Sequence, residues 1–270
     1  MSRRKKRQLP AEPRELEIVD LSHDGRGVAV DGEKRVFVHG GLPGERVVAR
    51  ITGRRRNFDE GESLAVLDRS PDRVEPQCPC FGICGGCSLQ HLDSERQIEF
   101  KQNTLVQNLA RIGKVEAAEL WTPLTGPRWG YRRKARLSVR HVRKKGRVLV
   151  GFRERYGRFV ADMQTCHVLD PRVAGQLEAL SALILTMDAR ESIPQIEVAC
   201  GDRACALVFR HLEALGAEDL SKLREFALAS GLAVMLQPAG PGSIPCLEPA
   251  QVELSYELPE FGVELAFGPS

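Results

Sequence analysis

The segment CPCFGICGGCSLQHL, residues 78–92, places four of the eight cysteines of this 270-residue chain within ten residues. Thiolates this close repel one another unless a cation or a cluster neutralises them. Glycines between the cysteines allow the backbone to wrap around such a centre without a steric penalty. The spacing therefore predicts a metal-binding loop formed by Cys78, Cys80, Cys84 and Cys87.

Spacing alone leaves an iron–sulfur cluster, a zinc ion and unligated thiols open. A structural zinc site usually has two separated Cys-x-x-Cys pairs, and only Cys84 and Cys87 form such a pair here. An iron–sulfur cluster is commonly bound by cysteines of one loop together with one from far along the chain. The spacing favours iron–sulfur over zinc.

The remaining composition indicates a cytoplasmic protein. The N-terminal run MSRRKKRQLP is basic and is not followed by an apolar segment, so we expect neither a secretory signal nor a membrane anchor. No later segment is apolar over the length that spans a bilayer. Thiols stay reduced in the cytoplasm, which favours metal ligation over disulfides. Three further cysteines in apolar contexts are expected to be ordinary buried residues: Cys200, Cys205 and Cys246.

Positive charge is concentrated in residues 128–158, which carry thirteen Lys and Arg but one acidic residue, although the whole chain has a net charge of only +3. Such asymmetry is typical of a surface that binds a polyanion. Ala135, Leu137 and Val139 alternate with polar residues, which predicts a strand with one buried and one basic face. The alternative is that these charges pair with the acidic remainder of the chain. The residues that we expect to contact phosphates are Arg132, Arg133, Lys134, Arg136 and Arg140.

Residues 14–68 predict a small closed barrel of the OB type, because short segments of strand pattern alternate with glycine turns and no helix pattern occurs. The expected strands are 16–21, 27–30, 35–38, 45–52 and 62–67.

A helix pattern follows the cysteines. Ser94 and Gln97 predict a capping box at its start, and Gly113 predicts a left-handed stop. Its expected apolar face carries Ile98, Leu105, Leu109 and Ile112.

The last half of the chain alternates strand and helix patterns, which predicts a mostly antiparallel sheet with helices. Helices are expected at 171–187 and 218–230, and strands at 131–140, 147–153, 196–200, 204–210, 234–237, 251–256 and 263–267. The predicted fold class is α+β, with a small N-terminal OB-like β-barrel, an iron–sulfur loop and an α+β central domain. The expected parts are a basic tail (1–12), the barrel (13–70), the cysteine loop (71–92), a helix (93–125) and the central domain (126–270).

The run Cys78–Cys87, with Leu89–Leu92 after it, closely resembles the cluster loop of the 23S rRNA uracil-5-methyltransferases. The resemblance spans nearly the whole chain, and the N-terminal barrel resembles the TRAM domain of that family, an OB-like RNA-binding module. Similar residues continue through 129–139, 150–154, 162–166, 193–197 and 263–267.

The resemblance implies a four-iron, four-sulfur cluster bound by Cys78, Cys84, Cys87 and the distant Cys166, with Cys80 as the odd thiol of the loop. It also implies S-adenosylmethionine as the methyl donor and 23S rRNA as the partner. In this family a cysteine thiolate adds to carbon 6 of a flipped-out uracil, so that carbon 5 can attack the methyl group. We expect a monomer that does not bind membranes.

We expect the groups that perform this chemistry to lie outside this chain. No strand followed by a glycine-rich cofactor loop occurs up to Ser270, so no catalytic or S-adenosylmethionine-binding residue is assigned here. The helix of residues 93–125 is expected to pack on the absent methyltransferase domain. The alternative function is a stand-alone RNA-binding iron–sulfur or zinc protein without catalysis.

Overall fold

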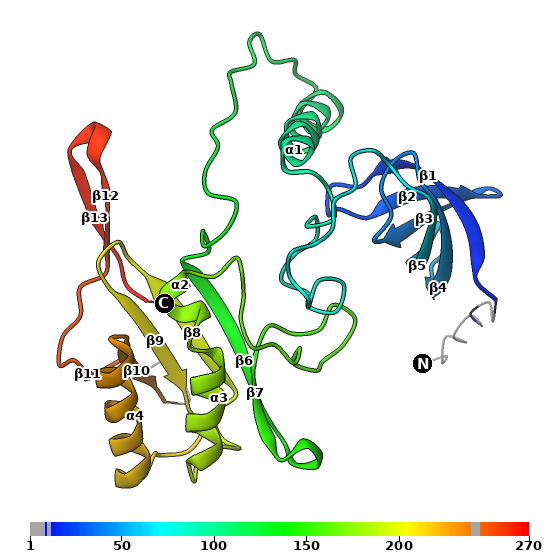
Figure 1. Ribbon diagram of the computed structural model, residues 1–270. Coiled ribbons are helices and arrows are strands. Elements are labelled where there is room, and N and C mark those ends of the chain that lie inside the picture. The colour runs from blue at the N-terminus through cyan, green and yellow to red at the C-terminus, as the bar shows by residue number, and fades with distance from the viewer. Residues whose placement is uncertain (1–8, 10–11, 239–243, 270) are drawn as a thin grey trace, which may run out of the picture. The chain divides into compact units, whose positions relative to one another are not determined.

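The computed structural model describes residue 9 and residues 12–238 and 244–269 (Figure 1). The chain divides into two compact units. The first combines the residues up to Gln77 with Cys87–Thr125, and the second combines Cys78–Gly86 with the residues from Gly126 onward. Most of the predicted basic tail lies outside the described residues.

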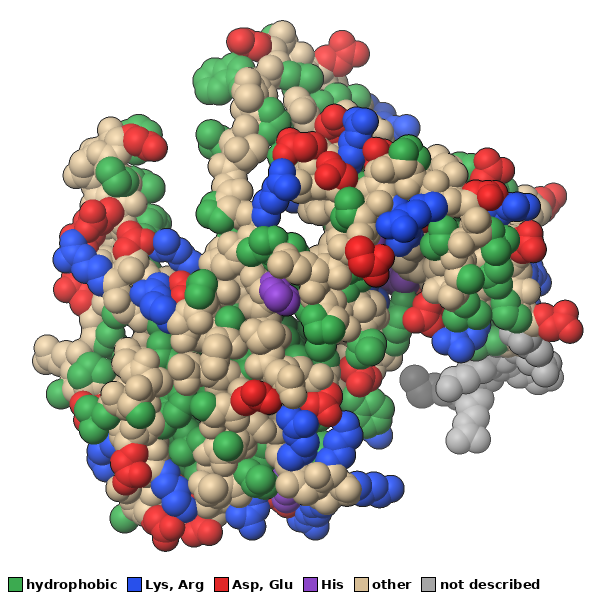
Figure 2. Space-filling view, in the orientation of Figure 1, with side chains coloured by type: hydrophobic (Ala, Val, Ile, Leu, Met, Phe, Trp, Pro, Cys, Tyr) green, Lys and Arg blue, Asp and Glu red, His purple; other side chains and the backbone are tan. Residues whose placement is uncertain are grey.

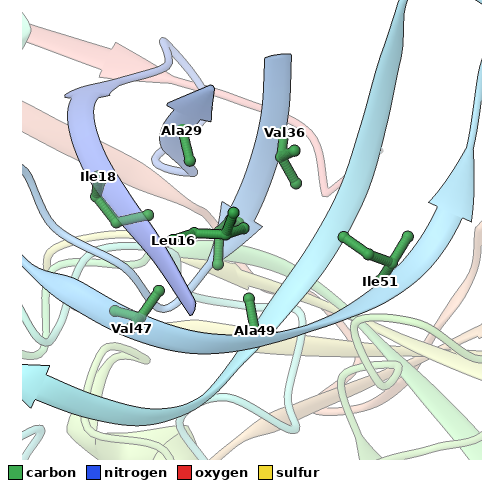
Figure 3. Packing of buried hydrophobic residues seen from close by; sticks show 8 residues of the cluster. Leu16, Ile18, Ala29, Val36, Val47, Ala49 and Ile51 are labelled. Carbon is green, nitrogen blue, oxygen red and sulfur yellow. The ribbon is translucent and has the colours of Figure 1, made fainter. Parts of the chain in front are cut away.

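The first unit contains a closed five-stranded barrel in the order β1-β2-β3-β5-β4. The residues that alternate inward along each strand, among them Ile18, Val36 and Ile51, form its apolar core (Figure 3). The predicted OB-like barrel is confirmed. Its strands are β1 (Arg14–Leu21), β2 (Gly27–Asp31), β3 (Lys34–His39), β4 (Arg46–Arg54) and β5 (Phe58–Asp68).

A buried ion pair fastens the segment that follows the barrel. Glu45 is fully buried, and its Oε2 accepts hydrogen bonds from Arg73 Nη2 at 2.7 Å and from the Leu42 N–H at 2.8 Å. The Ser70 N–H donates to Oε1 at 3.2 Å. Burial opposes ionisation of Glu45, but the hydrogen bonds from Arg73, Leu42 and Ser70 outweigh burial and lower the pKa of this carboxyl.

Helix α1 (Ser94–Asn108) continues into a π-helical turn, Leu109–Gly113. Asp93 caps it, accepting hydrogen bonds from the backbone N–H groups of the first turn, so the predicted capping box of Ser94 and Gln97 is wrong. A carboxylate is favoured here by the helix dipole. Gln97 instead donates to backbone carbonyls before the helix. The left-handed residue at the other end is Lys114, with φ of 55°, rather than Gly113.

The second unit is built on a six-stranded sheet in the order β11-β10-β9-β8-β6-β7, antiparallel except for the β9–β10 pair. Figure 1 shows α3 (Leu177–Thr186) and α4 (Ala217–Ser230) side by side on one face. The strands are β6 (Lys134–Val142), β7 (Arg147–Gly151), β8 (Gln195–Cys200), β9 (Cys205–Arg210), β10 (Ala233–Gln237) and β11 (Cys246–Glu248). The predicted α+β architecture is confirmed.

The largest differences from the expected bounds in this unit concern one helix and one strand, and β11 was not expected. The helix expected over 171–187 is broken, because α2 (Pro171–Ala174) ends before α3 begins. The strand expected over 251–256 starts only at β12 (Ser255–Leu258), which forms a hairpin with β13 (Val263–Ala266). Leu254, just before β12, is instead buried against alanines of β8, β9 and β10.

The β8–β9 hairpin is closed by a disulfide between Cys200 and Cys205. The antiparallel register places these two residues directly opposite each other. Both are buried as expected, but the expectation that they are ordinary thiols is wrong. Cys246 is half-buried in β11.

Candidate metal centre and nucleic-acid interface

The first part of the cysteine loop, Cys78–Gly86, is held by backbone pairing to residues 153–155 of the second unit. The Gly85 N–H donates to the Arg153 carbonyl at 2.9 Å, and the Arg155 N–H donates to the Ile83 carbonyl at 2.8 Å. A side chain at Gly85 would bring its Cβ to 3.2 Å from the Arg153 carbonyl oxygen. The loop therefore has a defined place beside the end of β7.

Several cysteines converge where this loop lies. Cys84 and Cys166 are buried, whereas Cys78 and Cys80 are half-buried. Burial raises the pKa of the Cys80 thiol, and the nearby Cys78 and Cys166 sulfurs add to the rise. Cys84 Sγ accepts a hydrogen bond from the Gly86 N–H at 3.3 Å. The structure thus brings the distant Cys166 to the loop.

Cys87, the remaining predicted ligand, belongs to the first unit. Its place among the ligands stays a prediction.

The spacing of the loop sulfurs bears on which centre they fit. Zn–S bonds of about 2.3 Å would hold the sulfurs of one tetrahedral ion about 4 Å apart. Throughout the described residues, three ligand atoms lie within 4.8 Å of one another only at Asp170, Cys200 and Cys205. That group does not include the loop cysteines, so the choice between an iron–sulfur cluster and a zinc ion stays a prediction.

The group at Asp170 is already satisfied without a metal. Its two sulfurs form the disulfide, and Asp170 Oδ2 accepts from Arg172 Nη2 at 2.8 Å. The Arg172 hydrogen bonds lower the pKa of Asp170 against the opposing effect of burial. The same Arg172 nitrogen donates to the Gly201 carbonyl at 2.8 Å, so the ion pair supports the hairpin turn.

Arg132, which we predicted to contact phosphate, also contacts other residues of the chain. Its Nη2 donates to the Gly86 carbonyl at 3.0 Å, and its guanidinium lies 5.3 Å from the centroid of the Phe152 ring. The hydrogen bond to Gly86 holds the cysteine loop to the segment just before β6. Sequence reasoning missed this supporting role, since nothing in the local pattern links residues 86 and 132.

Strand β6 presents the basic face that its alternation predicts. Lys134, Arg136 and Arg140 are exposed, while Leu137 and Val139 are buried.

Two of the predicted cations on and beside β6 have acidic partners, as the alternative interpretation expected. Arg136 Nη2 lies 3.0 Å from Glu197 Oε1, and Arg133 pairs with Asp202. The Arg133 pair places Asp202, in the turn of the β8–β9 hairpin, beside a residue that we expect to contact RNA.

Figure 2 shows a further group of Lys and Arg side chains where β6 and β7 are joined. The joining turn carries Arg143, Lys144 and Lys145. Arg143 pairs with Glu191 at 2.7 Å and Lys145 pairs with Asp162 at 2.8 Å. These three residues lie in the basic segment 128–158, which was a reason to expect phosphate contacts from them, but we predicted none.

Comparison with known proteins gives the context for these features. The TRAM domain family matches residues 10–64, which include most of the barrel. Over 98% of this chain, a protein of Alkalilimnicola ehrlichii named 23S rRNA (uracil(1939)-C(5))-methyltransferase RlmD is 51% identical. A protein of Xanthomonas campestris with the same name is 50% identical over 98% of the chain. The resemblance to the 23S rRNA uracil-5-methyltransferases is confirmed.

The chain spans about 60% of the length of these relatives. A tRNA (uracil-54, C5)-methyltransferase of Pyrococcus abyssi, solved in complex with S-adenosyl-L-homocysteine, has the same fold over 94% of this chain, with a TM-score of 0.63 and 19% identity. The alignment covers 59% of that structure. No helix of the described residues is long and apolar enough to cross a membrane.

Proposed function

We propose that this chain is the RNA-recognition and iron–sulfur portion of an S-adenosylmethionine-dependent 23S rRNA uracil-5-methyltransferase. The observation that carries this proposal is an identity of 51% to a relative of that name over 98% of the chain. The catalytic groups and the methyl-donor site would lie in the part of the relatives that this chain does not span. The chain alone would then bind RNA and transfer no methyl group.

RNA binding is assigned to the TRAM-like barrel and to the basic residues on and beside β6. Each phosphate contact displaces condensed counterions, so removing one contacting charge lowers the salt slope of binding by about one. We expect the triple variant Lys134→Ala, Arg136→Ala, Arg140→Ala to bind 23S rRNA fragments more weakly, with a slope reduced by about three. Filter binding over a series of salt concentrations measures both quantities.

The matched control is the triple variant Arg203→Ala, Arg210→Ala, Arg224→Ala, which removes exposed cations elsewhere in the same unit. It should change the affinity and the slope much less. If the two triple variants had equal effects, RNA binding would depend on the overall charge of the chain and not on the β6 face.

The iron–sulfur cluster is assigned to Cys78, Cys84, Cys87 and Cys166. Support comes from the burial of Cys84 and Cys166 and from the proximity of Cys166 to the loop. When bound, the cluster would cross-link the loop to the segment that carries Cys166. We assign it a structural role, because Cys78–Gly86 contains three glycines and its Ile83 is 60% exposed.

Anaerobically purified protein should absorb broadly in the visible, and Cys166→Ser should abolish that absorbance. Cys80→Ala is the control from the same loop and should retain it. Colourless protein that contains one zinc ion per chain would support the zinc alternative instead.

A further inference from the structure

The first unit contains a cleft of about 440 Å³ between the outer surface of β1, β2 and β3 and the C-terminal half of α1. This volume lies within the range of roughly 300–1,000 Å³ that is common for small-molecule sites. The strands form one wall of the cleft and the helix forms the other, and the two walls differ in polarity.

Part of the strand wall is apolar where a barrel surface is normally polar, although Asp20, Ser22, His23 and Arg35 also line the cleft. Val19 and Val30 are each 58% exposed, and the register places Val28 opposite Phe37. The Phe37 ring is held edge-to-face by Phe58, at 5.3 Å between centroids, and the Arg26 guanidinium lies 4.8 Å from it. Outward positions on such strands usually carry polar residues. A contiguous apolar patch at outward positions marks a contact surface.

The helix wall is polar. Thr104, Gln107, Asn108 and Arg111 all line the cleft, and their spacing places them on one face of α1 and its π-helical extension. Ile112, at 79% exposed, lies outside the cleft lining. One turn before Thr104, the same face packs Phe100 against the cluster that includes Leu21 of β1. Beyond Phe100 the helix turns hydrogen-bonding groups, and not its apolar residues, toward the cleft.

We propose that this cleft binds one unpaired nucleotide of RNA. Its base would lie against Phe37 and the valines, with its polar edge toward the amides of Gln107 and Asn108. Proteins that recognise single-stranded RNA combine aromatic stacking with hydrogen bonds to base edges in this way. This inference rests on the proposed RNA-recognition function.

The charges of the cleft fit a nucleotide. Arg35 and Arg111 line it, and both could contact the phosphates that flank the base. Asp20 is the single acidic residue among the described lining residues, and its Oδ1 accepts a hydrogen bond from the Leu21 N–H. The cations therefore outnumber the acid where an anionic backbone would pass.

The test uses the full chain and a short single-stranded RNA in which 5-iodouridine replaces successive uridines. Irradiation should cross-link one position of the RNA to the peptide that contains Phe37. Phe37→Ala should weaken binding about tenfold, the effect of losing one base–aromatic stack, and Phe37→Tyr should retain it. Asn108→Ala should weaken binding, whereas Asn103→Ala, an exposed asparagine of α1 outside the cleft, should not.

The outcomes separate this site from the proposed function. Cross-links confined to the second unit, with Phe37→Ala and Asn108→Ala binding normally, would overturn the nucleotide cleft and leave the β6 surface intact. Absence of RNA binding by the wild-type chain would overturn both. Loss of the Phe37 cross-link in a longer version that still binds RNA would assign the cleft to a protein contact instead.

Discussion

We expect the replacement of Glu45 to destabilise the barrel strongly. Glu45→Gln leaves the largely buried Arg73 guanidinium without its carboxylate, so we expect the free energy of unfolding of the barrel to fall by roughly 3 kcal/mol at neutral pH. Because the folded-state pKa is lowered, the stabilisation is present above the unfolded pKa and is lost as the pH falls through the folded pKa. The difference between the two proteins should therefore shrink in acid. The hydrogen-exchange protection of β4, recorded over a series of urea concentrations, measures this free energy. Glu62→Gln is the control, because Glu62 pairs with Arg50 at the surface, at 2.8 Å, and should contribute less than about 1 kcal/mol. Equal losses in the two variants would contradict the assignment.

At the scale of the element, α1 is attached at one end only. None of residues Ser94–Asn108 is buried, although Phe100 packs against the cluster of Leu21, Leu42 and Leu92. Leu105 and Ile112 remain 58% and 79% exposed, and apolar surface left in water costs roughly 25 cal/mol per Å². We propose that the part of the relatives outside this chain covers this face. Hydrogen exchange of residues 98–112 should then be fast in this chain, fastest beyond Leu105, and slower in a longer version. Helix α4, which buries Leu223 and Ala227, is the reference for slow exchange. Strong protection of 98–112 in this chain alone would show that the face is already covered.

At the scale of the whole molecule, the features that sequence reasoning predicted depend on local periodicity. The alternation of Ala135, Leu137 and Val139 with charged residues was enough to place β6 and its exposed basic face, because side chains of a strand alternate regardless of what covers them. The Cys200–Cys205 disulfide depends instead on the strand register. The Arg133–Asp202 pair depends on a contact between residues 69 positions apart in the sequence. The cleft was missed for a related reason, since outward-facing valines of a strand read in sequence as ordinary core residues.

The chain crosses between its two compact units three times, after Gln77, after Gly86 and after Thr125. The barrel strands form one continuous stretch of sequence, but the unit that contains them does not, because α1 is reached only after the excursion through Cys78–Gly86. A fragment that stops before the cysteines would keep the barrel and lose the helical wall of the cleft. Transferring the barrel alone to another protein would thus transfer the strand wall of the cleft without the amides of Gln107 and Asn108 that face it. Recombination at a single junction after Thr125 would exchange the complete unit only together with Cys78–Gly86, which belongs to the other unit.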